Sequence, residues 1–181
     1  MTTATNSTLD LRTLGEGDEQ AFLAGLRAWD RDDPSWHSFV WTEGLTFPEM
    51  LEILDRERRG VDLAPGRVPH TMLYAFVDDE IVGRCSIRHE LNDSLRRRGG
   101  HVGYAVAPPF RRRGYAGEIL RQGLVHCASL GLRSVMITCD DANVGSWKTI
   151  ERAGGTLAET VWDAEATEWI RRYWIELSPP G

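Results

Sequence analysis

The six residues Arg111-Arg112-Arg113-Gly114-Tyr115-Ala116 constrain this chain more than any other segment. They join a strand-like run, from His101 to Ala107, to a helix-like run, from Tyr115 to Leu130. A bend with glycine at its centre that opens a helix directs several backbone N–H groups into one concavity, where the helix dipole adds partial positive charge. Three arginines add full charges. The segment therefore suits a pyrophosphate and predicts a phosphate-bearing cofactor.

Size and composition favour one ordinary globular domain. The chain has 181 residues, of which 41% are hydrophobic and 27% are charged, so we expect a single domain over residues 1–181. Its formal net charge of −6 argues against a nucleic-acid partner bound through bulk charge. The same charge is compatible with a cationic substrate such as an amine.

The cysteines and the termini bear on metal content and location. Cys85, Cys127 and Cys139 are odd in number, and their spacing fits neither a zinc site nor a disulfide framework. We expect three reduced, buried thiols and no metal. The polar N-terminus lacks the blocks of a signal peptide, and no apolar run approaches the ~20 residues of a membrane helix. These features predict a cytoplasmic protein without a membrane partner.

Hydrophobic periodicity predicts the element order β-α-α-β-β-β-α-β-α-β-β. This order describes one α/β domain without repeats or linkers. The expected strands are 9–13, 70–77, 81–91, 101–107, 133–139, 156–162 and 168–177, the expected helices are 18–29, 48–60, 115–130 and 143–153, and 92–100 is expected to be an exposed turn.

At this point the chain resembles the GNAT superfamily of acyl-CoA-dependent N-acetyltransferases. The family signature after its fourth strand matches Arg111, Gly114 and Ala116. A second match is a buried strand followed by a helix that begins at Asn143-Val144-Gly145-Ser146 and ends at Gly154-Gly155. The resemblance implies a mixed, mostly antiparallel sheet flanked by helices and splayed between strands 4 and 5.

Two further stretches resemble a bacterial subgroup of predicted acetyltransferases. They are residues 87–92, Ile-Arg-His-Glu-Leu-Asn, and residues 100–104, Gly-His-Val-Gly-Tyr. No substrate follows from this part of the resemblance.

The resemblance implies a binding site for acetyl-CoA as co-substrate. In the family, backbone groups of the bend hold the pyrophosphate, the end of the fourth strand pairs with the pantetheine arm, and an asparagine opening the next helix bonds that arm. Asn143 also suits the cap of its helix. The implied cofactor-binding residues are Val106, Ala107, Arg111, Arg112, Arg113, Gly114, Tyr115, Ala116, Asn143 and Ser146.

The chain departs from the family at the general acid. Many members carry a tyrosine seven residues after the asparagine, which protonates the leaving thiolate, whereas this chain has Ile150. Ser146, Tyr104 or a water could supply the proton. A thiolate with a pKa near 8.5 can also leave without an acid.

The general base is equally open. An attacking amine is mostly protonated at pH 7 and must lose a proton. His101 begins the predicted fourth strand, and His89 and Glu90 end the predicted third strand beside it. We favour Glu90 and His101 as catalytic residues, with a solvent-facing position at the sheet edge as the alternative for each.

Acidic and aromatic residues alternate between the first two helices. Carboxylates and indole faces could bind a cationic amine there; a solvated loop with buried tryptophans is the alternative. The residues are Trp29, Asp30, Asp32, Asp33, Trp36, Trp41 and Glu43. Trp162, Trp169, Tyr173 and Trp174 in the last strands are expected to be core or dimer contacts, which leaves monomer and homodimer open.

The resemblance thus predicts transfer of an acetyl group from acetyl-CoA to a primary amine of a small molecule or peptide, by direct attack in a ternary complex. An apolar setting makes Cys139 a poor covalent relay. A rival is an acyl-CoA-binding sensor of the same fold with little catalysis. A nucleotide-dependent kinase would need a P-loop lysine followed by Ser or Thr, which the bend lacks.

Overall fold

The structure is a computed structural model that describes residues 8–29 and 37–178. The expected order of strands and long helices is confirmed. One short helix, α3, replaces the turn expected after the third strand. The elements are β1 (Asp10–Arg12), η1 (Glu16–Asp18), α1 (Glu19–Ala28), α2 (Phe47–Arg59), β2 (His70–Val77), β3 (Glu80–Arg88), α3 (Asp93–Arg97), β4 (Val102–Val106), η3 (Pro108–Phe110), α4 (Tyr115–Ser129), β5 (Ser134–Asp140), α5 (Val144–Arg152), β6 (Thr156–Asp163) and β7 (Glu168–Glu176).

The strands form two antiparallel sheets rather than one mixed sheet. The first sheet has the order β1-β2-β3-β4 and the second has the order β5-β7-β6. Between β4 and β5 there is one isolated bridge, from Gly100 to Ile137. The predicted opening between the fourth and fifth strands is therefore confirmed, and it separates the strands into two sheets that remain connected at this bridge.

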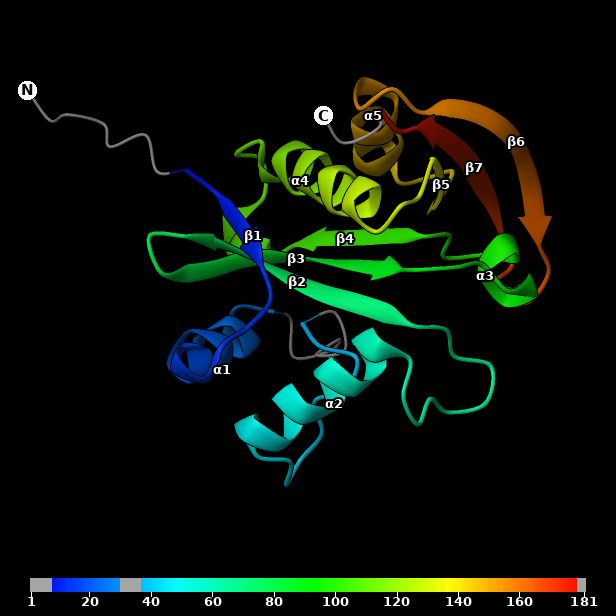
Figure 1. Cartoon of the computed structure of the whole chain (residues 1–181). Coiled ribbons are helices and arrows are strands. Elements are labelled where there is room, and N and C mark those ends of the chain that lie inside the picture. The colour runs from blue at the N-terminus through cyan, green and yellow to red at the C-terminus, as the bar shows by residue number, and fades with distance from the viewer. Residues whose placement is uncertain (1–7, 30–36, 179–181) are drawn as a thin grey trace, which may run out of the picture.

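Helices cover both faces of the first sheet (Figure 1). Helices α1 and α2 lie on one face, against an aromatic core that includes Phe22, Phe47 and Tyr74. Helix α4 lies on the other face, where the larger core joins it to both sheets and to α5. The opening between β4 and β5 is thus bordered by α4 and α5 on the side of the larger core.

Local sequence explains the ends of these elements. Asp78 and Asp79 adopt positive φ angles of 49° and 64°, which a tight turn between β2 and β3 requires. Thr46 forms a capping box with Glu49 at the start of α2, and Gly60 ends that helix in the left-handed region.

The two sheets are joined at one end of the opening. The backbone N–H of His101 donates to the Met136 carbonyl at 2.7 Å, and the Met136 N–H donates back to His101 Nδ1 at 2.9 Å. At the Gly100 bridge, a side chain could not fit, because a Cβ there would lie 2.3 Å from the Met136 carbonyl oxygen. The sheets therefore meet closely here and separate toward Val106.

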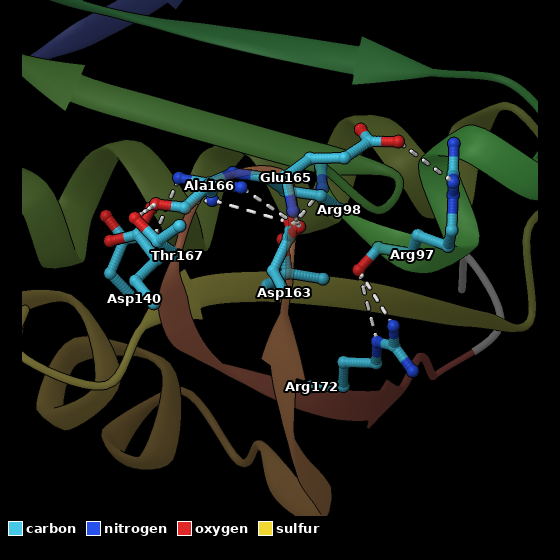
Figure 2. A network of polar contacts seen from close by, with 11 residues as sticks. Arg97, Arg98, Asp140, Asp163, Glu165, Ala166, Thr167 and Arg172 are labelled. Carbon is cyan, nitrogen blue, oxygen red and sulfur yellow. Dashed lines mark hydrogen bonds and ion pairs between the residues drawn. The ribbon is translucent and has the colours of Figure 1, made fainter.

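Arg98 strengthens this joint from the end of α3 (Figure 2). Its guanidinium lies 2.9 Å from Asp140 at the end of β5, 2.7 Å from Glu168 and 3.6 Å from Asp163 in the β6–β7 hairpin. Arg172 donates to the Arg97 carbonyl at 3.2 and 3.0 Å. Residues 92–100, expected as an exposed turn, therefore fasten the first sheet to the second.

Strand β3 is shorter than predicted, because it ends at Arg88. His89 and Glu90 follow it in a bend, and Glu90 is exposed. The prediction that both end the third strand was wrong. The cysteines match the expectation, because all three thiols are free and buried. None of the described helices is long and apolar enough to cross a membrane.

Candidate functional site

The bend between β4 and α4 has the backbone that the sequence predicts. Gly114 precedes the helix with a φ of 85°, and Arg112 also has a positive φ, of 65°. The Gly117 N–H donates to the Gly114 carbonyl at 3.2 Å and closes the first turn of the helix. The preceding N–H groups of the helix start have no partner one turn back, so they are available to an anion.

The three arginines of the bend take different positions. Arg111 and Arg112 line a cavity of about 940 Å³ in front of the helix start, which we name the first cavity. Arg111 Nε also donates to the Val106 carbonyl at 3.1 Å. Arg113 does not line this cavity and donates instead to the Pro109 carbonyl at 3.2 Å. Two of the three guanidinium groups therefore face the predicted anion site.

The first cavity has further cations that the sequence analysis missed. Lys148, which is the only lysine of the chain, and Arg152 come from α5, and Arg121 comes from α4. Their contribution depends on α5 packing beside α4, which the local sequence does not reveal. Glu118 lines the cavity too and pairs with Arg121 at 2.7 Å, so a polyanion would meet positive charge mainly from the bend and from α5.

Strand β4 presents a free backbone edge to the opening. The Ala107 N–H donates to the Val82 carbonyl at 2.9 Å, and the Arg88 N–H donates to the His101 carbonyl at 2.7 Å. Because bonding directions alternate along an antiparallel strand, the backbone groups of Tyr104 and Val106 point away from β3. Val106 thus lies where the sequence analysis expects it, whereas Ala107 is buried and its N–H is already used.

Asn143 and Ser146 line a second cavity, of about 430 Å³, which continues the first. The two cavities share Val106, Arg111, Ala116 and Gly145. Asn143 Oδ1 accepts the Ser146 N–H at 3.0 Å and so caps α5. The cap uses the side-chain oxygen, which leaves the amide nitrogen free to donate to a ligand.

Tyr104 and Ser146 lie together where the second cavity meets a third one. The Tyr104 hydroxyl lies 3.2 Å from both the carbonyl oxygen and Oγ of Ser146. Burial raises the pKa of Tyr104 to about 12, although its bond with Ser146 acts in the opposite direction. Ile150, at the position of the usual acid, is fully buried in the core. Two proton-bearing hydroxyls therefore lie at this junction.

The third cavity, of about 360 Å³, also contains an acid that the sequence analysis missed. It shares Tyr104, Asn143 and Ser146 with the second cavity, and Asp140 lies on its wall. Burial is the largest influence on Asp140 and raises the pKa of its carboxyl, while the nearby Arg98 lowers it. The sequence signal for this residue was a carboxylate at the end of an apolar strand. Cys139 lines the same cavity, and burial raises the pKa of its thiol to about 11.

The two favoured bases lie elsewhere. His101 is 7% exposed, and its Nδ1 accepts the Met136 N–H in the joint between the sheets. Burial lowers the pKa of His101 to about 4. Glu90 is exposed in the bend after β3. Neither lines the third cavity, so the structure does not bring them together with Tyr104 and Ser146.

The acidic and aromatic segment is described only in part. Asp30, Asp32, Asp33 and Trp36 lie outside the described residues. Trp29 is buried and lines the second cavity. Trp41 packs on the aromatic core, and Glu43 is exposed. These two residues match the alternative of a solvated loop with its tryptophans packed inside.

The aromatic residues of the last strands have separate positions. Tyr173 is buried, and Trp174 lies against His101 with ring centroids 6.3 Å apart. Trp162 and Trp169 pair edge to face and are about half exposed, at 52% and 51%. In the described chain no group of three or more His, Cys, Asp or Glu side chains could hold a metal ion.

Comparison with known proteins agrees with this arrangement. A family profile described as "Acetyltransferase (GNAT) domain" matches residues 9–156. Among curated proteins, none matches the chain in sequence.

Solved structures share the fold over nearly the whole chain. RimJ of Mycobacterium smegmatis, in complex with CoA-disulfide, is 20% identical and has a TM-score of 0.65, over 94% of this chain and 82% of that one. The protein yncA of Salmonella typhimurium, with its cofactor acetyl-CoA, is 13% identical with a TM-score of 0.61, over 96% of both chains. A chimeric spermidine N-acetyltransferase SpeG from Vibrio cholerae is 16% identical with a TM-score of 0.61, over 94% and 96%. At these identities the likeness establishes the fold.

Proposed function

Given that the chain belongs to the GNAT acetyltransferase family, we propose that it transfers an acetyl group from acetyl-CoA to a primary amine, by direct attack in a ternary complex. One observation carries this proposal. Adjoining cavities lead from the start of α4 along the free edge of β4 to the bonded hydroxyls of Tyr104 and Ser146. That path has a cationic end for phosphates and a proton donor at the other end.

The cofactor extends along this path in the proposal. Its pyrophosphate accepts bonds from backbone N–H groups of Gly114 to Ala116, with Arg111 and Arg112 beside it. The pantetheine arm pairs with the backbone edge at Val106 and receives the amide of Asn143. Arg113 and Ala107 are left out of the proposal, because Arg113 does not line the first cavity and the Ala107 N–H already donates to Val82. The relatives solved with CoA-disulfide and with acetyl-CoA support this placement.

The reaction needs one nucleophile and one proton donor. The amine nitrogen attacks the thioester carbonyl carbon, and the tetrahedral intermediate then loses the C–S bond. Tyr104 donates its hydroxyl proton to the departing sulfur, with Ser146 holding the phenol in place. The amide nitrogen gives up its extra proton, and solvent returns one to Tyr104, so the products are the N-acetyl compound and free CoA.

The ammonium form of the acceptor must first lose a proton. We assign this role to Asp140, because it is the carboxylate on the wall of the third cavity, which Tyr104 also lines. Glu90 and His101 take no part in the proposal. The cytoplasmic location and the choice between monomer and homodimer stay predictions.

Thermal unfolding with and without acetyl-CoA tests the proposal. A ligand at about 100 times its dissociation constant adds about 2.7 kcal/mol, which raises the midpoint of a domain of this size by roughly 5–10 °C. ATP serves as the control for phosphate binding alone. The proposal also requires CoA release that depends on an added amine. A rise in midpoint without release from any amine would favour the binding-module alternative, and no rise would refute both.

A further inference from the structure

A polar stripe crosses the face of the first sheet opposite α4. Side chains alternate along a strand, and Arg84, Ser86 and Arg88 of β3 share this face. In the register of the sheet, Ser86 pairs with Gly103 and Arg84 pairs with Ala105. A Cβ at Gly103 would lie 3.1 Å from Arg88 Nη1, so the glycine lets the guanidinium lie close against β4.

Arg88 is a partly buried cation with few partners. Its Nη1 donates to the Gly99 carbonyl at a long 3.4 Å, and it forms no ion pair with the residues that the structure describes. Burial lowers the pKa of Arg88 from its usual value. Cations taken out of water are normally paired, so a site that leaves one on a cavity wall is suited to an anionic ligand.

Arg88 stands between the third cavity and a fourth one, of about 260 Å³. Phe39 is the other residue that both cavities share. The fourth cavity also has Arg67 on its wall, and none of its described lining residues is a carboxylate. Glu57 pairs with Arg67 at 3.3 Å, so the positive charge of this cavity comes mainly from Arg88.

Ser86 supplies an independent sign of a ligand in the fourth cavity. The residue is 0% exposed, lines the cavity, and its hydroxyl has no hydrogen-bond partner among the described residues. A buried hydroxyl without a partner costs free energy. A carboxylate oxygen placed between Ser86 and Arg88 would accept from both.

The third cavity also has a carboxylate on its wall, in addition to Arg88. This carboxylate belongs to Asp140, which lines the cavity with Tyr104 and Ser146. Arg98 donates a hydrogen bond to Asp140 Oδ1 at 2.9 Å. The wall of the third cavity thus has a carboxylate, Asp140, and a guanidinium, Arg88, that forms no ion pair among the described residues. This arrangement suits a zwitterion.

We propose that the acceptor is a small free amino acid, whose amine lies at Asp140 and Tyr104 and whose carboxylate is bound by Arg88 and Ser86. This inference rests on the proposed function and names its substrate class. It opposes the hint from net charge, because the acceptor end has arginines although the whole chain is acidic. The acceptor would occupy parts of the third cavity, of about 360 Å³, and of the fourth, of about 260 Å³, volumes that suit a small ligand.

Matched acceptors test this without any change to the protein. Each free amino acid is compared with its decarboxylated amine and its amide in acetyl-CoA-dependent CoA release. We expect the best amino acid to exceed its two partners at least tenfold in kcat/KM. Spermidine and peptides with an acidic second residue complete the panel.

Variants then locate the carboxylate. Arg88→Gln should lower kcat/KM for the amino acid at least tenfold, mainly through KM, and change that for the decarboxylated amine less than twofold. Arg88→Lys should recover part of the loss, and Ser86→Ala should cost several-fold. Arg59→Gln removes an exposed arginine of α2 that pairs with Asp55 and should change nothing. Binding of the amino acid to the acetyl-CoA complex, by ligand-observed NMR, gives a readout independent of turnover.

The outcomes separate the two proposals. Turnover of amines without a preference for a carboxylate, or with a preference for spermidine, overturns the amino-acid inference and leaves the transferase. Use of acidic peptides but not of free amino acids also overturns it. If no amine is turned over and NMR shows equal binding to the wild-type protein and to Arg88→Gln, both proposals fail.

Discussion

The two ends of the site are built in different ways. The proposed phosphate end consists mainly of backbone groups from one short segment, Arg111 to Ala116, at the start of α4. The acceptor end consists of side chains from β3, β4 and β5, among them Arg88, Tyr104 and Asp140. Its geometry therefore depends on how two separate sheets meet.

This difference has an energetic consequence. Backbone donors at a helix start are fixed by the helix itself, so the phosphate end needs few outside contacts. The acceptor end is held by the joint at Gly100 and His101 and by the Arg98 ion pairs. Changes in the joint should affect the acceptor end and leave the phosphate end intact.

The largest expected effect comes from Gly114→Glu. A carboxylate would face the pyrophosphate, and the φ of 85° disfavours any side chain. We expect the dissociation constant of acetyl-CoA to rise at least 100-fold, about 2.7 kcal/mol, by calorimetric titration.

Gly131→Glu is the matched control. Gly131 follows the other end of α4 with a φ of 84°, and, as at Gly114, a Cβ would meet no atom within 4 Å. The two variants should lose similar stability in urea unfolding, and only Gly114→Glu should lose affinity. Equal affinities would mean that this end of the site does not hold the phosphates.

The bend at the start of α4 could be predicted from the sequence because its residues are consecutive. Glycine and arginine at fixed spacing between a strand and a helix predict the bend, its positive φ and its charge. Asn143 and Ser146 were readable for the same reason, as the start of a helix. The opening between β4 and β5 came from the family resemblance and not from periodicity.

The acceptor end was not readable from local patterns. Arg88 and Asp140 are 52 positions apart and meet only because both border the third cavity. His101 was misread because a histidine near neutrality suggests a base, whereas tertiary burial made it an acceptor for Met136. Glu90 was misplaced because β3 ends at Arg88, two residues earlier.

Tyr104→Phe should sharpen the comparison at the acceptor end. Removal of the hydroxyl takes away the proposed proton donor, so we expect kcat to fall about 100-fold in steady-state CoA release. The dissociation constant of acetyl-CoA should stay the same. Tyr173→Phe is the control. It removes a hydroxyl that donates to Glu151 at 2.9 Å and does not line the cavities, so kcat should stay the same. An unchanged kcat in Tyr104→Phe would mean that the thiolate leaves without this acid.

Acid should lower the free energy of unfolding through three buried histidines, of which His101 lies in the joint between the sheets. Burial lowers the pKa of His37, His70 and His101 to about 4 from an ordinary 6.5. Between pH 6.5 and 4 these histidines bind protons in the unfolded chain but not in the folded chain. Their contribution to stability is therefore full above pH 6.5 and is lost as the pH falls toward 4. Each histidine contributes a slope of up to about 1.4 kcal/mol per pH unit.

His101→Asn isolates one of these contributions. The Asn oxygen can still accept the Met136 N–H but does not titrate in this range. Urea unfolding between pH 7 and 4.5 should show a shallower decline, by about 1–2 kcal/mol, while the pH profile of kcat stays as in the wild-type protein. A shift in the pH profile of kcat would mean that His101 takes part in catalysis.

The smallest effect is expected from Arg98→Gln. Its side chain is 42% exposed, so its network should contribute only about 1 kcal/mol to stability. Because Arg98 positions Asp140, KM for the acceptor should rise several-fold, with no change for acetyl-CoA.

Arg97→Gln is the neighbouring control. This side chain is more exposed and pairs with Glu165 at 3.6 Å, whereas the bonds from Arg172 go to its backbone carbonyl and survive the change. Loss of acetyl-CoA affinity in Arg98→Gln, measured by calorimetric titration, would show that the two ends are not independent.

The free edge of β4 has a consequence for how the protein survives in a cell. Arg111 occupies the Val106 carbonyl, but no described strand pairs with the edge at Tyr104 and Val106, and without a bound cofactor such an edge is a template for joining to another chain. A pantetheine arm on that edge would hide it. Scarcity of acetyl-CoA would then do more than slow the reaction: it would leave more copies open to aggregation and degradation, so the lifetime of the protein would follow the supply of its own co-substrate.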